Sequence, residues 1–133
     1  MDLPPQKRVY ARKRILVIDD DIGVTTLVKR YLEEYGQFEV LVLNTSRESL
    51  SVARNFNPDL ILLDLMMPVK TGDEVADDMK GDPQLKDTPI IFLTGVILEQ
   101  EAKSRDGRIG GHVFMSKPVN LQDLMQCIHK NIR

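Results

Sequence analysis

Asp64 comes directly after an apolar run, at the point where the sequence predicts that a strand leaves a sheet. The run 60–63 is apolar at every position, which is typical of a parallel strand covered by helices on both faces. Pro68 and Gly72 follow within eight residues and indicate a turn. Many Asp residues in such turns only bond nearby backbone amides. The carboxyl edge of an open α/β sheet is nevertheless where ligands bind, so the pattern makes Asp64 a candidate functional residue.

Polar side chains follow other apolar runs in the same way. If all these runs are parallel strands, their carboxyl ends meet at one edge of the sheet and the polar groups converge. Carboxylates that lie close together repel each other unless a cation neutralises them. Oxygen ligands in an incomplete shell suit Mg²⁺. The groups expected at this edge are Asp19 and Asp20 after the run 15–18, Asp64 after 60–63, Thr94 after 90–93 and Lys117 after 112–116.

This set of groups predicts phosphoryl-transfer chemistry. Beside a bound metal ion, the Asp64 carboxylate can attack phosphorus as a nucleophile. The metal, the Lys117 ammonium and the Thr94 hydroxyl would stabilise the equatorial oxygens, which is most of the help that phosphoryl transfer requires. Asp21 has a simpler interpretation, because an Asp at the start of a helical pattern is a preferred N-cap.

Strands and helices alternate along the predicted chain. Capping-box patterns at 45–48 and 71–74 and an N-cap at Asn120 indicate where three helices begin. Glycines at 107, 110 and 111 lower the helix propensity of 96–111, so we expect a short or mobile helix there. Five strand–helix units in strict alternation predict an α/β fold with a doubly wound, five-stranded parallel sheet in the order 2-1-3-4-5.

Composition and charge exclude several classes of protein. A chain of 133 residues with 42% hydrophobic and 29% charged residues is typical of one soluble domain. Its longest apolar runs are about six residues, whereas a membrane span needs ~20. The single cysteine, Cys127, cannot form an internal disulfide and fits a reducing cytosol, so we expect a cytoplasmic protein. We expect residues 1–13 to be a basic, flexible leader and 14–133 to form the domain.

Four motifs, in order and in spacing, resemble the receiver domain of bacterial two-component response regulators. The resemblance runs from about Arg14 to the C-terminus and implies a flavodoxin-like receiver fold. It also implies that Asp64 accepts a phosphoryl group from a histidine kinase or histidine phosphotransfer protein, with Mg²⁺ as cofactor. The motifs are Ile18-Asp19-Asp20-Asp21, Leu63-Asp64-Leu65-Met66-Met67-Pro68 with Gly72, Leu93-Thr94-Gly95 and Ser116-Lys117-Pro118.

The resemblance also implies a role for each residue of the site. Some residues would hold the metal, one would supply positive charge, and two would reorient when the phosphoryl group arrives. Asp20 resembles the direct Mg²⁺ ligand, Asp19 a ligand acting mainly through metal-bound water, Asp64 and the Met66 backbone carbonyl further ligands, Lys117 the family's cation, and Thr94 and Phe114 the switch pair.

On this basis the chain is expected to be a phosphoacceptor signalling domain, not an enzyme, although it assists its own phosphorylation and dephosphorylation. We expect signalling through a downstream protein, since no DNA-binding domain follows Arg133 in this sequence, and Met1 with the basic leader favours a stand-alone regulator. A receiver excised from a hybrid histidine kinase or larger regulator is the alternative. Homodimers would form through the fourth helix, fifth strand and fifth helix.

Apolar Met66 and Val96 predict slow self-dephosphorylation, because neither orients an attacking water.

Other function classes fit the sequence less well. A phosphatase of the haloacid dehalogenase type needs a second acidic residue two positions after its nucleophile, where this chain has Met66. A nucleotide- or flavin-binding module of this architecture would carry a phosphate-cradling glycine loop, and neither of the two common patterns is present. A docking domain without chemistry would not need the complete set of carboxylates.

Overall fold

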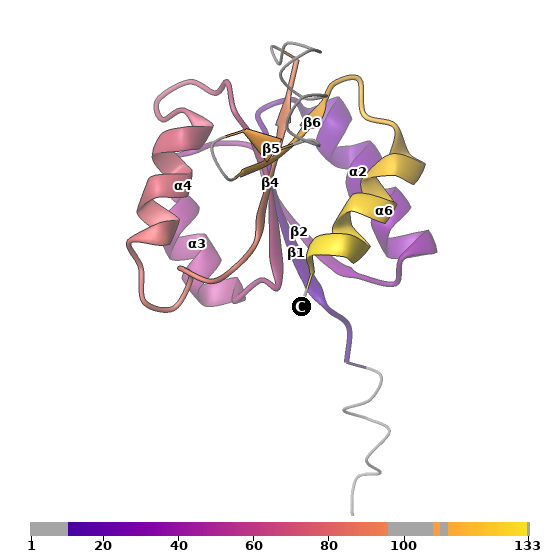
Figure 1. The fold of residues 1–133 in the computed structure, drawn as a ribbon, viewed down its shortest axis with the longest axis horizontal. Helices are drawn as coiled ribbons and strands as arrows, with labels where there is room; N and C mark the ends of the chain where they lie inside the picture. The colour runs from indigo at the N-terminus through magenta and orange to yellow at the C-terminus, as the bar shows by residue number, and fades with distance from the viewer. Residues whose placement is uncertain (1–10, 96–107, 110–111, 133) are drawn as a thin grey trace, which may run out of the picture.

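The computed structural model describes residues 11–95, 108–109 and 112–132. Helices α2 and α6 cover one face of a central sheet, and α3 and α4 cover the other (Figure 1). The strands are β1 Arg14–Ile18, β2 Glu39–Leu43, β3 Leu60–Asp64, β4 Ile90–Thr94, β5 Arg108–Ile109 and β6 His112–Ser116, and the helices are α2 Ile22–Tyr35, α3 Ser49–Phe56, α4 Gly72–Lys80 and α6 Leu121–Asn131.

The sheet has the order β2-β1-β3-β4-β6-β5. Its first five members are parallel, so the predicted order 2-1-3-4-5 is confirmed, with β6 as the fifth strand. Strand β5 is an addition that pairs antiparallel with β6. The helix expected over 96–111 is therefore wrong at 108–109, and the rest of that segment lies outside the described residues. Pairing with β5 covers part of a sheet edge whose backbone groups would otherwise have no partner.

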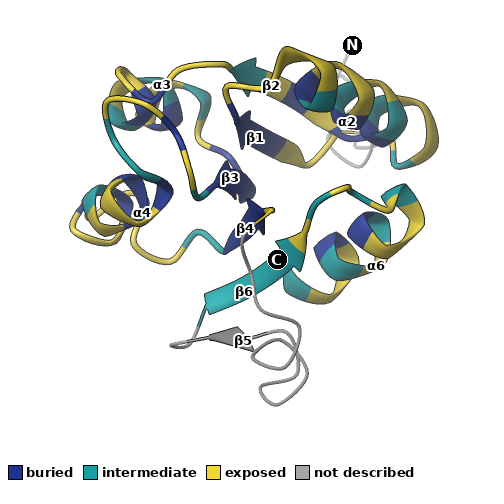
Figure 2. Ribbon diagram, turned by 90° about the horizontal axis from the view of Figure 1, so that it is seen from above, coloured by how far each residue is buried: buried dark blue, intermediate teal, exposed yellow. Residues whose placement is uncertain are grey.

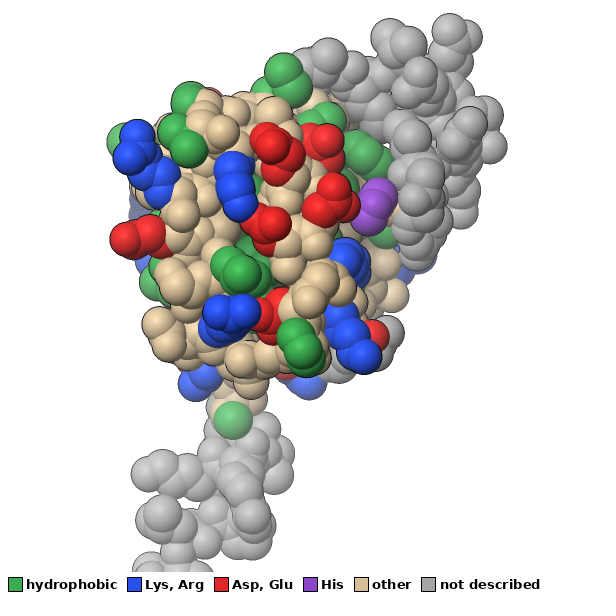
Figure 3. Space-filling view, turned by 90° about the vertical axis from the view of Figure 1, so that its left-hand side faces the viewer, with side chains coloured by type: hydrophobic (Ala, Val, Ile, Leu, Met, Phe, Trp, Pro, Cys, Tyr) green, Lys and Arg blue, Asp and Glu red, His purple; other side chains and the backbone are tan. Residues whose placement is uncertain are grey.

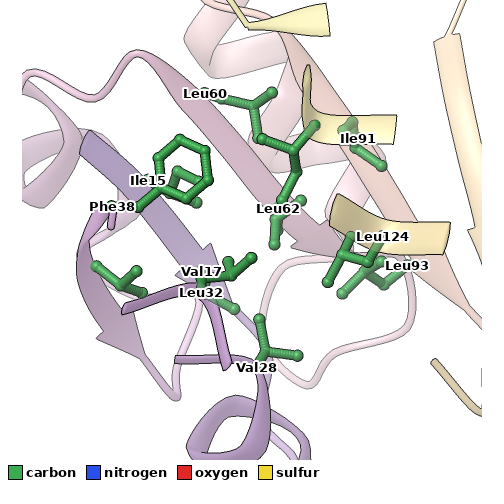
Figure 4. Close-up of a cluster of buried hydrophobic side chains, with 12 residues drawn as sticks. Ile15, Val17, Val28, Leu32, Phe38, Leu60, Leu62, Ile91, Leu93 and Leu124 are labelled. Atoms are coloured by element: carbon green, nitrogen blue, oxygen red, sulfur yellow. The ribbon is translucent and has the colours of Figure 1, made fainter. Parts of the chain in front are cut away.

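Two apolar layers fix the sheet between the helices. Alternate residues of a strand point to opposite faces, so Leu62 contributes to the layer under α2 and α6, and Leu63 to the layer under α3 and α4. Figure 4 shows side chains of the first layer, including Leu62, Leu32 and Leu124, directed toward one another from different elements. Residues 60–63 are all 0% exposed. Asp64 therefore extends from a strand that is packed on both faces.

The helix ends follow the predicted capping signals in most places. Asp21 Oδ1 accepts from Val24 N at 3.1 Å and caps α2, and Asn120 Oδ1 accepts from Asp123 N at 3.0 Å and caps α6. The Glu74 carboxylate accepts from the backbone N–H that precedes α4 at 2.9 Å, as in a capping box. None of the helices within the described ranges is long and apolar enough to cross a membrane.

The capping box expected at 45–48 is wrong. Helix α3 begins at Ser49, and its N-cap Glu48 makes no capping hydrogen bond through its side chain. Thr45 Oγ1 instead accepts from Arg47 N at 3.3 Å, as in a local turn. The next hydroxyl, that of Ser46, is bonded to the loop that follows β3. Tertiary hydrogen bonds therefore override the local capping pattern here.

Helix α4 has one face packed against the sheet and one charged face exposed to solvent. Val75, Ala76 and Met79 are buried against the sheet. Acidic side chains gather on the surface formed by α3 and α4 (Figure 3), to which α4 contributes exposed Asp73 and Asp77. This is the usual amphipathic arrangement of a helix that covers a sheet.

Candidate functional site

Three carboxylates meet at the carboxyl edge of the sheet. Asp64 ends β3 and Asp19 follows β1, which lies beside β3 in parallel register. One oxygen atom from each of Asp19, Asp20 and Asp64 lies within 4.8 Å of the others. Asp19 and Asp64 are 0% and 4% exposed, whereas Asp20 is exposed to solvent. The structure thus brings together the three carboxylates that strand order placed at this edge.

An ammonium group lies against these carboxylates. Lys117 Nζ is 2.8 Å from Asp19 Oδ2 and 3.5 Å from Asp64 Oδ1. Burial alone would lower the pKa of Lys117, but the hydrogen bond and charge of Asp19, together with the charge of Asp64, outweigh it and raise that pKa. Lys117 is therefore fully charged at neutral pH.

Burial makes Asp64 an unusually weak acid for a carboxyl group. Desolvation and the negative charge of Asp19 raise the pKa of Asp64 from 3.8 to about 6, against the opposing effects of Lys117 and the Met66 N–H. Asp64 is still mostly ionised at neutral pH, which is the state that a nucleophile requires. Without a further cation its charge is held at a free-energy cost, because the site is buried.

Backbone groups fix both buried carboxylates. Asp21 N donates to Asp19 Oδ1 at 2.9 Å, and Met66 N donates to Asp64 Oδ1 at 3.3 Å. Gly72 lies so close to β3 that a Cβ at this position would be 2.3 Å from the Asp64 backbone oxygen. The predicted turn after Asp64 therefore depends on a glycine, because there is no room for any side chain at this close approach.

Thr94 and Phe114 lie on the next two strands of the sheet. Thr94 ends β4, is 1% exposed, and its carbonyl accepts from Lys117 N at 2.9 Å. Phe114 lies on β6, and its ring stacks on Phe92 with centroids 5.0 Å apart. The Phe114 side chain is half-buried. Thr94 is thus linked to the lysine of the site, and Phe114 packs beside the same pair of strands.

The donor set fits a hard divalent cation. When ionised, the three carboxylates and the Lys117 ammonium together carry two negative charges in excess. All of its donors are oxygen atoms, and the exposed Asp20 leaves the cluster open to water. Mg²⁺ prefers this combination of a few carboxylates and retained water. The grouped residues that would hold it are Asp19, Asp20 and Asp64, and the Met66 backbone carbonyl stays a prediction as a further ligand.

Asn44 is a residue of this region that sequence reasoning missed. Its Nδ2 donates to the Asp19 backbone oxygen at 2.8 Å and to the buried Thr25 hydroxyl at 3.0 Å. The amide therefore holds the backbone of the buried carboxylate from the neighbouring strand. Asn44 directly follows β2, so the rule that selected the other strand ends applies to it as well. Ser46, also missed, had no such signal, because its pattern indicated a capping box.

Two further predictions involve residues of which the structure describes only a part. Met66 follows Asp64 by two positions and is 59% exposed. Val96, its expected partner in excluding water, lies outside the described residues, and so does most of the segment expected to form the fourth helix of a dimer face.

Proteins similar to this chain include response regulators. The probable transcriptional regulator ycf29 of Pyropia yezoensis is 31% identical over 120 residues, which cover 90% of this chain and 53% of that relative, so the chain spans about half its length. The polar-differentiation response regulator DivK of Brucella ovis is 29% identical over 117 residues, covering 87% of this chain and 93% of DivK. The structure of the chemotaxis protein CheY4 of Vibrio cholerae superimposes with a TM-score of 0.78 at 30% identity, covering 92% of this chain and 100% of CheY4.

The family model of the response regulator receiver domain matches residues 15–129. The match begins at the second residue of β1, spans the other four parallel strands and most of α6, and therefore includes every residue of the acidic site. The chain belongs to the response regulator receiver domain family, the signalling domains of two-component systems.

Proposed function

We propose that Asp64 accepts a phosphoryl group from a histidine kinase or histidine phosphotransfer protein in a Mg²⁺-dependent reaction. The observation that carries the proposal is the buried Asp64 carboxylate, 3.5 Å from the Lys117 ammonium and beside Asp19. Receiver domains bind Mg²⁺ at an acidic cluster of this kind. The proposal assigns this general activity to particular atoms of this chain.

In the proposed reaction an oxygen of the Asp64 carboxylate attacks the phosphorus of a phosphohistidine. A new O–P bond forms while the P–N bond breaks, and the imidazole keeps the electron pair of the broken bond and takes up a proton from water. The product is an acyl phosphate on Asp64. No other covalent step is required, so positioning and charge supply the catalysis.

Each residue of the site has a distinct task in this reaction. Met66 N and Gly72 fix the position of Asp64, through a hydrogen bond and a close backbone contact. The Lys117 ammonium lies where it can contact an oxygen of the incoming phosphoryl group. A bound Mg²⁺ ion would supply the positive charge that the phosphoryl oxygens need.

Thr94 and Phe114 are proposed to transmit the phosphorylation state to a downstream protein. A phosphoryl group adds roughly 1.5 to 2 negative charges at this edge of the sheet. These charges attract the Thr94 hydroxyl, and its movement leaves space for Phe114 to turn inward. The half-buried position of Phe114 beside Phe92 is compatible with such a change of packing.

Labelling with acetyl phosphate tests the proposed acceptor. In the presence of Mg²⁺ the wild-type chain should gain one acid-labile phosphoryl group, which chelation of the metal should prevent. D64N keeps the shape of the side chain and removes its charge, so it should gain none. D87N removes an exposed aspartate away from the site and should label like the wild type. Equal labelling of wild type and D64N would refute the proposal.

A further inference from the structure

The loop after β3 contains a strained turn at Val69. Val69 has a φ of 73°, in the left-handed region that β-branched residues rarely adopt. Lys70 N donates to Pro68 O at 2.9 Å, which closes a γ-turn around Val69. A γ-turn with positive φ is rare and strained. Val69 is 67% exposed, so packing around it does little to hold this conformation.

One buried hydroxyl bonds to both sides of this turn. Ser46 belongs to the loop after β2 and is 2% exposed. Its Oγ donates to Pro68 O at 2.9 Å and accepts from Lys70 N at 3.0 Å. The hydroxyl therefore joins the carbonyl before Val69 to the amide after it. Ser46 is itself held, because Ser49 Oγ at the start of α3 donates to its carbonyl at 2.8 Å.

The turn lies within the short connection that positions the acceptor. Met66, whose N–H holds Asp64 Oδ1, is three residues before Val69, and Gly72, which abuts the Asp64 backbone, is three residues after it. Gly72 N also donates to Leu65 O at 2.8 Å, which closes the loop. A change in the backbone at Val69 is therefore confined to a closed loop that includes both Met66 and Gly72.

We propose that Ser46 is a positioning residue, whose hydroxyl holds the strained turn at Val69 and thereby fixes the Met66 backbone beside Asp64. The inference deepens the proposed function and rests on it, since Met66 is one of the groups that would hold Mg²⁺. Ser46 acts through the loop, because its hydroxyl is hydrogen-bonded to Pro68 O and Lys70 N.

A double-mutant cycle of S46A and V69G tests this role. The ligand is Mg²⁺ alone. Its binding is measured from backbone NMR shifts during titration, because the chain has no tryptophan for a fluorescence titration. S46A should weaken Mg²⁺ binding by about 3- to 10-fold, at or below the lower end of the ~10- to 100-fold effects known for residues that support metal ligands. V69G should bind Mg²⁺ like the wild type, because glycine adopts a positive φ without strain. Adding S46A to V69G should then change the affinity little.

The matched control is S51A. Ser51 lies on α3 and is exposed, and its Oγ donates to Glu48 O at 3.2 Å, a bond within its own helix turn. S51A should therefore leave Mg²⁺ affinity unchanged. A purely structural role for Ser46 would lower the melting temperature of S46A but leave its Mg²⁺ affinity unchanged well below melting, and that result would overturn the proposal.

An equal loss of Mg²⁺ affinity from S46A in the wild-type and V69G backgrounds would also overturn it, since Ser46 would then act independently of the strained turn. The proposed function fails separately. If acetyl phosphate does not label the wild type but the cycle gives the expected Mg²⁺ affinities, the role of Ser46 in the loop is supported and that of Asp64 as acceptor is not.

Discussion

The central strands β1 and β3 differ sharply from β6 in how firmly they are held. Residues 15–18 of β1 and 60–63 of β3 are all 0% exposed, and each strand has a parallel neighbour on both sides (Figure 2). Strand β6 has no fully buried residue, and its outer neighbour β5 has only two residues. The carboxylates of the site therefore extend from the most constrained strands, whereas Phe114 lies on a strand with room to repack. The proposed chemistry and the proposed switch make opposite demands on rigidity, and the centre and the edge of the sheet match these two demands.

Matched valine substitutions should show the largest difference between these regions. Val17 on β1 and Val113 on β6 contact the same apolar layer, but only Val17 is fully buried. V17A should lower the free energy of unfolding by about 2 to 3 kcal/mol, and V113A by less than about 1 kcal/mol, because a partly exposed site leaves a smaller cavity. Urea denaturation measures both. Equal losses would show that β6 is held as firmly as the centre.

T94A should uncouple binding of a phosphate mimic at Asp64 from the conformational response at Phe114 on β6. Shifting a two-state switch almost completely takes ~5.5 kcal/mol, and a hydrogen bond to a charged group contributes about 1.5 to 3 kcal/mol. Loss of the Thr94 hydroxyl should therefore reduce the response to beryllofluoride, measured as NMR shift changes around Phe114. T88A, which alters a threonine at the opposite end of β4, serves as the control. Unaltered shift changes in T94A would exclude Thr94 from the switch.

D64N should stabilise the metal-free protein in a pH-dependent way. The pKa of Asp64 is raised to about 6 in the folded protein, from 3.8. The folded state therefore binds more protons than the unfolded state between these values, so stability falls as pH rises through about 6. A difference of one pKa unit between the folded and unfolded states corresponds to ~1.4 kcal/mol of unfolding free energy, and solvent near the site reduces this value. Above pH 7 in chelator, the unfolding free energy of D64N should therefore exceed that of the wild type by about 1 to 2 kcal/mol. Near pH 4 the gain should disappear.

D20A provides the comparison within the same cluster. Asp20 is exposed, so removal of its charge should raise the melting temperature in chelator by less than D64N does. It should also weaken Mg²⁺ binding. A lower melting temperature for D20A, or a gain for D64N that persists at pH 4, would contradict the repulsion argument.

The site could be predicted from sequence because strand ends follow from apolar runs. Once the order of the parallel strands is expected, Asp19, Asp64, Thr94 and Lys117 must lie at one edge. Residues whose role depends on tertiary hydrogen bonds were not predicted. Ser46 has the local pattern of a helix cap, and only the position of the loop after β3 turns its hydroxyl toward Pro68. Strand β5 was missed for a similar reason, since two residues carry no periodicity.

M66N tests the smallest expected effect, which concerns how long the phosphoryl group remains. The Met66 side chain is exposed beside Asp64 and cannot orient a water molecule. An amide at this position should speed phosphoryl loss by about 3- to 5-fold, since positioning a nucleophile lowers the barrier. The rate is measured with Mg²⁺ present and no partner protein. No acceleration, in M66N or in M66N combined with V96E, would mean that water access does not limit hydrolysis.

Chemical mapping of the phosphorylated residue tests the central claim most directly. Borohydride reduces an acyl phosphate to an alcohol, so the acceptor aspartate becomes homoserine and can be located by peptide fragmentation. After treatment with acetyl phosphate and Mg²⁺, we predict homoserine at position 64 alone. Homoserine at position 19 or 20, or none in a chain that has gained phosphate, would contradict the assignment of Asp64 as the acceptor held by the rigid centre of the sheet.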